Sequence, residues 1–305
     1  MKDKDGEHFV LPSAREDAKR ARSTAETAQT RSSSYRLAFA DEEFLLREEL
    51  RPVRLQLELL KPELGLQEHG IESTIVVFGS ARNKEPEEAE RILEAAREAA
   101  ASAPDDAGAQ AELRKAERIV RHARYYAEAR RFAQIVSRAG QDSDRRRAVI
   151  VTGGGPGIME AANRGAADVG AVSIGHNITL PHEQAPNAYI TPELAFQFHY
   201  FAIRKMHLMM RALALVVFPG GFGTLDELFE CLCLIQTGKA RPMPVLLFDR
   251  DYWERVIDFG TLVEEGVIGE KDLDLITPVQ SADEAWNVIR EHYAYTGLLP
   301  TPNDC

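Results

Sequence analysis

Short apolar runs alternate with glycine-containing turns and amphipathic segments from about residue 147 onward. The runs are nearly continuous in Val, Ile and Leu, as is typical of parallel strands covered on both faces. Segments with apolar residues at helical spacing follow most of them, so the pattern predicts βαβ units with right-handed crossovers. The predicted strands are 73–79, 148–152, 172–178, 214–218, 244–248 and 273–277, and the predicted helices are 157–168, 199–211, 224–237, 251–265 and 281–293.

The stretches on either side of the first predicted strand are rich in Ala, Glu and Arg and contain little glycine. Residues 84–122 predict two charged helices, broken at 104–108 and inserted before a crossover helix near Tyr125. Leucines at helical spacing before the first strand predict a helix that Pro52 kinks or restarts. We therefore predict an α/β fold with a doubly wound, mostly parallel, Rossmann-like sheet. Its expected parts are a helical N-terminal extension 1–70, a Rossmann-like domain 71–298 that carries the helical insertion, and a tail 299–305.

Composition narrows the possible functions. The formal net charge is −11 at pH 7, which argues against a general nucleic-acid binder because a polyanion would be repelled. A small anionic ligand remains compatible, since a few basic residues and helix N-termini can reverse the local field. The three cysteines are Cys231, Cys233 and Cys305, an odd set that forms no disulfide framework and suits a reducing compartment. The charged N-terminus and the lack of an apolar run of about 20 residues predict a cytoplasmic protein without a membrane segment.

Two glycine clusters follow predicted strands and open predicted helices. They are 153–157, with the sequence Gly-Gly-Gly-Pro-Gly, and 219–224, with the sequence Pro-Gly-Gly-Phe-Gly-Thr. Glycine lets the backbone approach a ligand, and the free N–H groups at a helix start attract an anion. Each cluster alone is also compatible with a simple tight turn. Two clusters at the carboxyl ends of strands in one sheet indicate a shared ligand crevice and predict a nucleotide-binding domain.

Two familiar nucleotide motifs do not fit these clusters. A dinucleotide fingerprint would need glycine at position 158, where the chain has Ile158, and no acidic residue ends the next strand. A phosphate loop of the G-x-x-x-x-G-K-[ST] type is also missing, because Gly238-Lys239 is followed by Ala240. The sequence therefore argues against an NAD enzyme and against a P-loop NTPase.

Three charged residues near the second cluster are candidates for chemistry. Glu227 falls in the first turn of a helix that Thr224 is expected to cap, and there it could simply complement the helix dipole or could face a ligand sugar. Arg204 and Lys205 are adjacent cations in an otherwise apolar segment, which is costly unless they meet anions; surface exposure is the alternative. No third ligand accompanies His199 and His207, so we expect no metal site.

These residues resemble the LOG (Lonely guy) family, whose members were formerly mislabelled lysine decarboxylases and look like nucleotide phosphoribohydrolases. The resemblance covers about 72–295. The residues around the motifs are similar to those of the larger bacterial branch of the family. The matching motifs are Val77 to Arg82, Thr152 to Ala161, Arg204-Lys205, and the P-G-G-x-G-T-x-x-E motif from Pro219 to Glu227.

The resemblance implies a hydrolase that cleaves the N-glycosidic bond of a purine nucleoside 5′-monophosphate to give free base and ribose 5-phosphate. The expected substrate is AMP or an N6-modified AMP, the cytokinin riboside 5′-monophosphate, and neither cofactor nor metal is needed. Arg204 and Glu227 match the family's catalytic residues. The implied substrate-binding residues are Gly79, Ser80, Arg82, Gly153, Gly154, Gly155, Glu183, Lys205, Gly220, Gly221, Phe222, Gly223 and Thr224. One departure is Cys233, where short members often have threonine, and it affects base specificity.

Alternatives from other classes remain at this point. One is a non-catalytic nucleotide or molybdenum-cofactor carrier that uses the same phosphate-binding glycines, and another is a structural oligomer. The presence of both Arg204 and Glu227 favours the enzyme, because a carrier needs no carboxylate at the sugar. A lysine decarboxylase is not expected, since Lys205 has neighbours that suit phosphate and not a Schiff base. The expected partners are the nucleotide and further copies of the chain, as a homodimer or larger homo-oligomer.

Overall fold

The computed structural model describes residues 12–142, 145–181 and 185–299. Contacts divide the chain into two compact units, Met1–Glu58 and Leu59–Cys305. In the first unit, Ser13 caps α1 (Ala14–Arg22) through a capping box with Glu16, and Asp41 caps α2 (Glu42–Leu45). Short 3₁₀ turns at Ser33–Tyr35 and Ala38–Ala40 lie between these helices, and a third, Glu48–Leu50, follows α2.

Helix α3 (Arg51–Glu68) runs from the first unit into the second. The predicted restart at Pro52 is confirmed, because this proline lies in the first turn, where a backbone N–H has no helical partner. Pro62 lies inside the same helix, and the sequence pattern did not indicate that a helix could continue through it. At the end of α3, Leu66 is buried in the core of the second unit.

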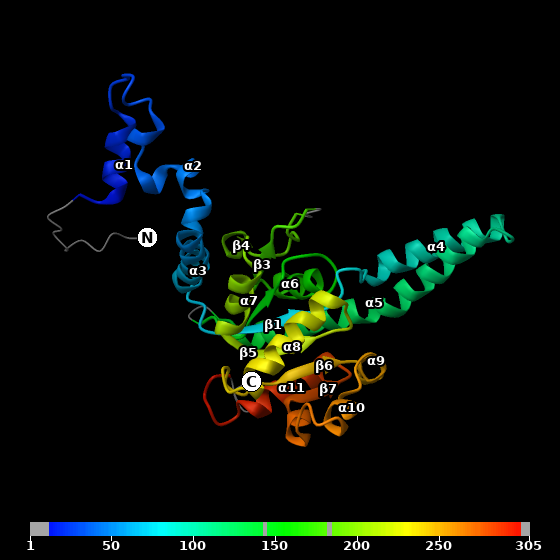
Figure 1. The fold of residues 1–305 in the computed structure, drawn as a ribbon. Helices are drawn as coiled ribbons and strands as arrows, with labels where there is room; N and C mark the ends of the chain where they lie inside the picture. The colour runs from blue at the N-terminus through cyan, green and yellow to red at the C-terminus, as the bar shows by residue number, and fades with distance from the viewer. Residues whose placement is uncertain (1–11, 143–144, 182–184, 300–305) are drawn as a thin grey trace. The chain divides into compact units, whose positions relative to one another are not determined.

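The described part of the second unit contains a seven-stranded sheet in the order β4-β3-β2-β1-β5-β6-β7. All neighbouring pairs are parallel, which confirms the predicted α/β, Rossmann-like class (Figure 1). The strands are β1 (Thr74–Phe78), β2 (Val149–Thr152), β3 (Ile174–Ile178), β4 (Ala195–Phe198), β5 (Ala212–Val217), β6 (Val245–Phe248) and β7 (Ile276–Val279).

The two edge strands differ from the prediction. Strand β4 was not predicted because its four residues alternate between exposed and buried and form no continuous apolar run. Strand β7 begins at Ile276 and not at Leu273, since a 3₁₀ segment (Glu270–Leu275) contains the preceding residues. Both edges therefore lack the uniform apolar signal that the central strands carry.

Helices cover both faces of the sheet, and alternate side chains of β1 pack into the hydrophobic core on each face. Ile75 and Val77 pack with α5, α6 and α11, whereas Val76 and Phe78 pack with α7, α8 and α9. The helices of this unit are α4 (Pro86–Ser102), α5 (Ala107–Gly140), α6 (Ile158–Asp168), α7 (Phe201–Met210), α8 (Phe222–Gln236), α9 (Arg250–Val256), α10 (Phe259–Glu264) and α11 (Ala282–His292).

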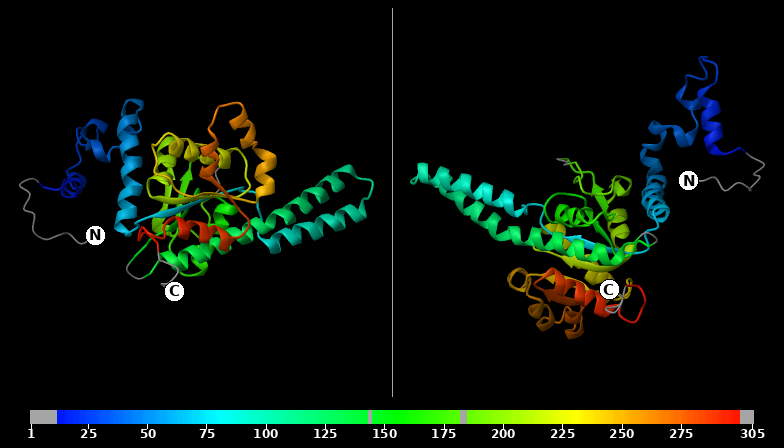
Figure 2. Two further views of the ribbon diagram at one scale, coloured as in Figure 1. Left: turned by 90° about the horizontal axis from the view of Figure 1, so that it is seen from below. Right: turned by 180° about the vertical axis from the view of Figure 1, so that it is seen from behind.

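The helical insertion is a hairpin of α4 and the first half of α5 that projects beyond the sheet (Figure 2). The predicted break at 104–108 is confirmed. The prediction of a separate crossover helix is wrong, because α5 continues for 34 residues from the hairpin across the sheet. Helix 251–265 was predicted as one element and is instead two, since Asp258 caps the start of α10. No helix of the described residues is long and apolar enough to cross a membrane.

Candidate functional site

A cavity of about 570 Å³ opens at the carboxyl ends of β1 and β5. The loop after β1 supplies one side of it, and the second glycine cluster together with the first turn of α8 supplies the other. Its lining residues are Phe78, Gly79, Ser80, Ala81, Arg82, Met159, Phe201, Arg204, Gly221, Phe222, Gly223, Thr224, Leu225, Asp226 and Glu227.

Two buried side chains of opposite charge meet in this cavity. Arg204, on α7, approaches Glu227, on α8, with 3.5 Å between Nη1 and Oε1, and both side chains are less than 10% exposed, at 9% and 8%. The Nε of Arg204 donates a hydrogen bond of 2.8 Å to the carbonyl oxygen of His176 on β3. The sheet therefore fixes the guanidinium, and the guanidinium faces the carboxylate.

Burial dominates the electrostatics of this pair. It raises the pKa of Glu227 to about 7, although the charges of Arg204 and Lys205 act in the opposite direction. Burial also lowers the pKa of Arg204, and the Glu227 charge opposes that change. A carboxyl group whose pKa lies near neutral pH can exchange a proton during a reaction, which is a property typical of catalytic acids and bases.

This pKa shift predicts how stability changes with pH. The pKa of Glu227 rises from an ordinary 4.5 to about 7 on folding, so its stabilising contribution is complete below pH 4.5 and is lost as the pH rises through 7. Glu227→Gln removes this titration. The free energy of unfolding of the variant, relative to that of the wild type, should therefore increase by up to about 3 kcal/mol between pH 4.5 and pH 7. Denaturant unfolding at several pH values measures the difference, and a difference that stays constant from pH 4.5 to 8 would contradict the shift.

Lys205 does not line the cavity. Its Nζ forms ion pairs with Asp226 at 2.8 Å and with Glu230 at 3.0 Å, and its side chain is largely buried between them. The Asp226 side chain is half-exposed, and Asp226 also lines the cavity. The phosphate contact that the family resemblance implies for Lys205 stays a prediction, because the described geometry directs this lysine to carboxylates.

The second glycine cluster is open toward the cavity. Helix α8 begins at Phe222 with Gly221 as its N-cap, so the prediction that Thr224 caps this helix is wrong; Thr224 lies within the first turn and is buried. No heavy atom lies within 4 Å of a Cβ built on Gly221 or Gly223. The first N–H groups of this 15-residue helix lack helical partners, and such groups attract anions.

The first glycine cluster lies behind the cavity and supports it. A Cβ at Gly153 would lie 2.6 Å from Nη2 of Arg204, so only glycine leaves room for the guanidinium. Gly154 has a positive φ of 74° and donates its N–H to Thr152 Oγ1, and Asn187 Nδ2 donates to the carbonyls of Gly154 and Gly155. Of these three glycines, Gly153 is the one that limits where the Arg204 guanidinium can lie.

Five of the predicted substrate-binding residues that the structure describes fall outside the cavity lining. Those lining it are Gly79, Ser80, Arg82, Gly221, Phe222, Gly223 and Thr224, in addition to Arg204 and Glu227. Those absent from its described lining are Gly153, Gly154, Gly155, Lys205 and Gly220. Glu183, also predicted to bind substrate, lies outside the residues that the structure describes.

Several residues that were not predicted as site residues lie at the site in the folded chain. Phe201 lines the cavity, with its ring 5.9 Å from Cζ of Arg204, and Met159 lines it from the start of α6. Tyr252, on α9, donates its hydroxyl to the carbonyl oxygen of Gly220 at 2.7 Å and so contacts the second glycine cluster. Met159 lies within the motif from Thr152 to Ala161 and Phe201 lies close to Arg204-Lys205, but Tyr252 is 32 residues away from its partner and only the fold joins them.

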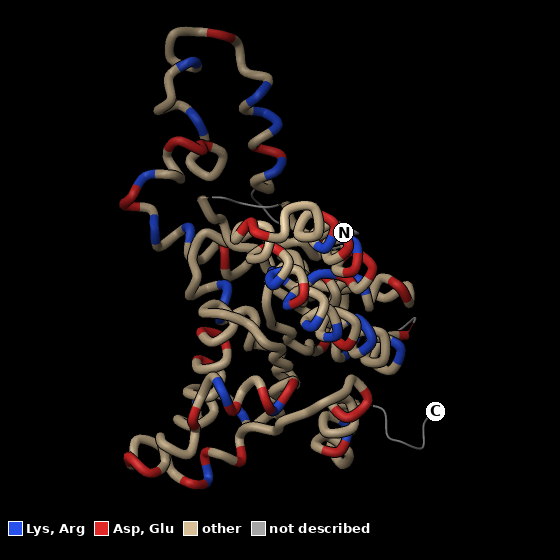
Figure 3. Tube along the Cα trace, turned by 90° about the vertical axis from the view of Figure 1, so that its right-hand side faces the viewer, with Lys and Arg blue, Asp and Glu red and all other residues tan. Residues whose placement is uncertain are grey.

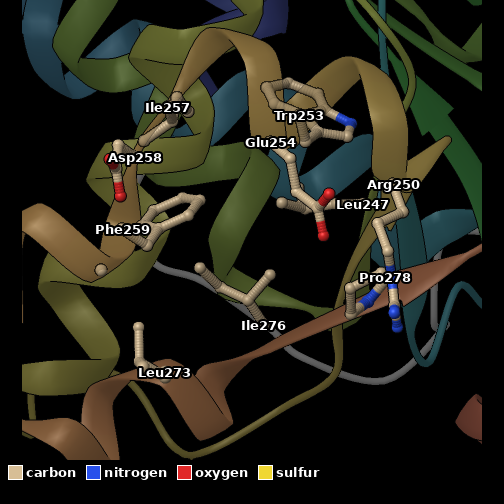
Figure 4. A pocket seen from close by; sticks show the side chains of 11 residues that line it. Leu247, Arg250, Trp253, Glu254, Ile257, Asp258, Phe259, Leu273, Ile276 and Pro278 are labelled. Atoms are coloured by element: carbon tan, nitrogen blue, oxygen red, sulfur yellow. The ribbon is translucent and has the colours of Figure 1, made fainter.

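Another cavity, of about 520 Å³, lies between α9, α10 and β7 and contains none of the predicted site residues (Figure 4). Phe259, Ile276 and Leu273 form much of its wall, and the Glu254 side chain points into it. Its lining lacks the glycine clusters that would approach a phosphate. Among the residues that the structure describes, no group of three His, Cys, Asp or Glu side chains could hold a metal ion.

The chain is similar in sequence to known proteins. A family model described as "Possible lysine decarboxylase" matches residues 159–289. The chain is 26% identical over 158 residues to the probable cytokinin riboside 5′-monophosphate phosphoribohydrolase LOGL3 of Oryza sativa subsp. japonica, covering 48% of this chain and 70% of the relative. It is 28% identical over 148 residues to the cytokinin riboside 5′-monophosphate phosphoribohydrolase LOG3 of Arabidopsis thaliana, covering 47% and 67%.

Among solved structures, the molybdenum cofactor carrier protein of Chlamydomonas reinhardtii is 15% identical, with a TM-score of 0.43 and coverage of 72% of this chain and 97% of that one. Fold and site together define a Rossmann-like α/β protein with an open glycine cluster beside a buried Arg–Glu pair. The family match and the relatives in rice and Arabidopsis support a narrower assignment, to the LOG family.

Proposed function

We propose that the chain hydrolyses the N-glycosidic bond of a purine nucleoside 5′-monophosphate, releasing free base and ribose 5-phosphate. The observation that carries this proposal is the buried Glu227 carboxyl group beside Arg204, in a cavity that an open glycine cluster borders. The names of the matched rice and Arabidopsis proteins support an N6-modified AMP, a cytokinin riboside 5′-monophosphate, as substrate. AMP itself belongs to the same chemical class.

In the proposed mechanism the second glycine cluster binds the 5′-phosphate. The N–H groups at the start of α8 and the hydroxyl of Thr224 border the open space in front of Gly221 and Gly223. Glu227 then lies one turn into the helix, on the side of the cavity where the ribose would extend. Its carboxylate stabilises the positive charge that builds on the sugar as the glycosidic bond breaks, and it polarises the attacking water.

Arg204 has a role that depends on this arrangement. Its charge opposes the effect of burial on Glu227 and so keeps part of the carboxyl group ionised near neutral pH. The guanidinium also borders the cavity, where it can bind the phosphate or stabilise the departing purine. Either contact needs the fixed orientation that the hydrogen bond to His176 provides.

The same pair favours an enzyme over a nucleotide or molybdenum-cofactor carrier. A carrier gains nothing from burying a carboxyl group next to the ligand, because desolvating it costs free energy and repels phosphate. An enzyme that stabilises a cationic transition state gains from this carboxylate. The buried position of Glu227 therefore supports catalysis.

The 5′-phosphate should be essential for turnover. If the second glycine cluster binds it, adenosine lacks the charge-assisted hydrogen bonds that orient the ribose toward Glu227. We expect kcat/KM for AMP to exceed that for adenosine by at least about 10²-fold. Purified protein incubated with AMP, an N6-modified AMP, CMP and adenosine, and assayed for ribose 5-phosphate or ribose, measures this. Equal values for AMP and adenosine would contradict phosphate binding, and release of no base from any nucleotide would overturn the proposed function.

We also propose that the chain acts as a homo-oligomer in the cytoplasm. Phe222 is 93% exposed and Phe201 is 49% exposed at the border of the cavity. Exposed aromatic side chains grouped at one place favour burial against another molecule. A second copy of the chain would shield them and narrow the entrance to the cavity.

A further inference from the structure

A cavity of about 360 Å³ lies between α5 and the connection from β6 to α9, and nothing in the proposed mechanism uses it. In the described parts of the chain it shares no lining residue with the Arg204–Glu227 cavity. Its lining residues are Arg121, His122, Arg124, Tyr125, Asp249, Asp251, Tyr252 and Arg255. Every one of them is polar or charged, so this cavity suits a charged ligand.

Arginines outnumber aspartates around this cavity, although the whole chain carries a net charge of −11. Figure 3 shows Lys and Arg interspersed with Asp and Glu along most of the trace, which makes a local excess of arginine notable. Arg124 is engaged by Asp249 at 2.6 Å. Among the residues that the structure describes, Arg121 and Arg255 form no ion pair within the chain. Two guanidinium groups on facing elements are thus available to an anion.

The effect of this charge is visible at His122, which lies in the same cavity. Burial lowers the pKa of its imidazole, and the charges of Arg121, Arg124 and Arg118 lower it further, whereas Asp249 raises it. The ring also lies beside Tyr125, with centroids 5.6 Å apart. The surroundings of His122 are therefore net positive, as in a site that binds an anion.

Hydrogen bonds of Asp249 join the two elements that form this cavity. Asp249 is buried and accepts hydrogen bonds from the hydroxyl of Tyr125 and from Arg124. Its φ is +70°, in the left-handed region that a non-glycine residue seldom adopts. Such a conformation costs free energy and persists where the surroundings hold it, often at ligand sites. Asp249 thus ties α5 to the start of α9 on the wall of the cavity that Arg121 and Arg255 also line.

We propose that this cavity binds a phosphate group, held between the guanidinium groups of Arg121 and Arg255 with His122 beside it. The ligand class is a small phosphate monoester or inorganic phosphate, because planar guanidinium groups bind phosphate oxygens in pairs. The volume of about 360 Å³ admits a phosphate with a small attached group. This site is separate from the proposed catalytic cavity and does not depend on the proposed hydrolysis.

Histidine NMR gives a local test. The ring signals of His122, assigned with a His122→Asn variant, are followed while inorganic phosphate or ribose 5-phosphate is added to the full chain at constant ionic strength. We expect saturable shifts of these signals and a rise in the pKa of His122 on binding, because the added anion favours the charged imidazolium. A larger effect with ribose 5-phosphate identifies a monoester as the ligand, and equal effects identify the phosphate group alone.

The variants locate the binding. Arg121→Gln together with Arg255→Gln should weaken phosphate binding at His122 by at least about tenfold. Arg118→Gln is the matched control, since Arg118 contributes to the same positive surroundings but does not line the cavity, and it should change the affinity less than threefold. Signals of His122 that do not respond to either phosphate, or an equal loss of affinity in the control variant, would overturn the proposal. Calorimetry on the same samples detects phosphate bound elsewhere, which keeps the two cavities distinguishable.

Discussion

Replacing Glu227 by glutamine should lower kcat by at least about 10²-fold and leave nucleotide binding largely intact. The substitution keeps the volume of the side chain but removes its charge and its ability to exchange a proton. Glutamine at this position cannot stabilise a cationic sugar, although the open glycine cluster in front of α8 can still bind the 5′-phosphate. Steady-state kinetics with AMP, together with calorimetric binding of AMP to the variant, separates the two effects.

Glu230→Gln provides a control with the same chemical change one turn along α8. Glu230 pairs with Lys205 at 3.0 Å and does not line the cavity, so we expect its kcat to stay within about threefold of the wild type. A Glu227→Gln variant that turns over as fast as Glu230→Gln would remove Glu227 from the mechanism. Loss of AMP binding in Glu227→Gln would instead assign the carboxyl group to ligand contact.

The acid limb of the pH–rate profile should report the ionisation of Glu227. Since burial raises the pKa of Glu227 to about 7, and since the proposed mechanism needs the ionised form, kcat should increase with pH through this region. The ionised form is also the one that burial destabilises. The site therefore holds its most reactive state at a cost in folding free energy, as expected where function opposes stability.

Much of the fold was predictable because the central strands are covered on both faces. Their apolar runs are continuous, and the loop after β5 carries the second glycine cluster, so the sheet and one side of the cavity could be inferred together. The first cluster was expected in the same crevice and instead lies outside the cavity lining. Edge strand β4 was not predicted because only one of its faces is buried. The full length of α5 was not predicted either, since a helix that begins in solvent and ends in the core changes its composition along its course.

The site was predictable where one short motif supplies several groups. The turn from Gly221 to Glu227 lies on one loop and one helix, so spacing alone placed the glycines beside the carboxylate. The partner of each cation was not predictable. Arg204 and Lys205 are neighbours in sequence, yet one faces Glu227 and the other Asp226, because consecutive residues on a helix point in different directions. Only the packing of α7 against α8 decides which of them enters the cavity.

Gly153→Ala should lower kcat by about 10²-fold although it replaces neither charged residue of the pair. The added methyl group would lie 2.6 Å from Nη2 of Arg204 and 2.9 Å from the sulfur of Met159. Both contacts are too close, and since the sheet holds the backbone, the guanidinium must move. Its displacement removes the charge that keeps the pKa of Glu227 from rising further, so less of the carboxyl group is ionised at neutral pH.

The diagnostic measurement is the pH–rate profile of this variant. If Arg204 acts through Glu227, the acid limb of kcat for Gly153→Ala moves to higher pH, and raising the pH recovers part of the lost activity. Gly155→Ala adds the same methyl group to the same loop but meets only the end of Met159, at 2.9 Å, so its acid limb should stay in place. A Gly153→Ala variant whose rate falls equally at every pH would mean that Arg204 contributes through the substrate alone. Charge coupling between the two buried side chains would then have no part in catalysis.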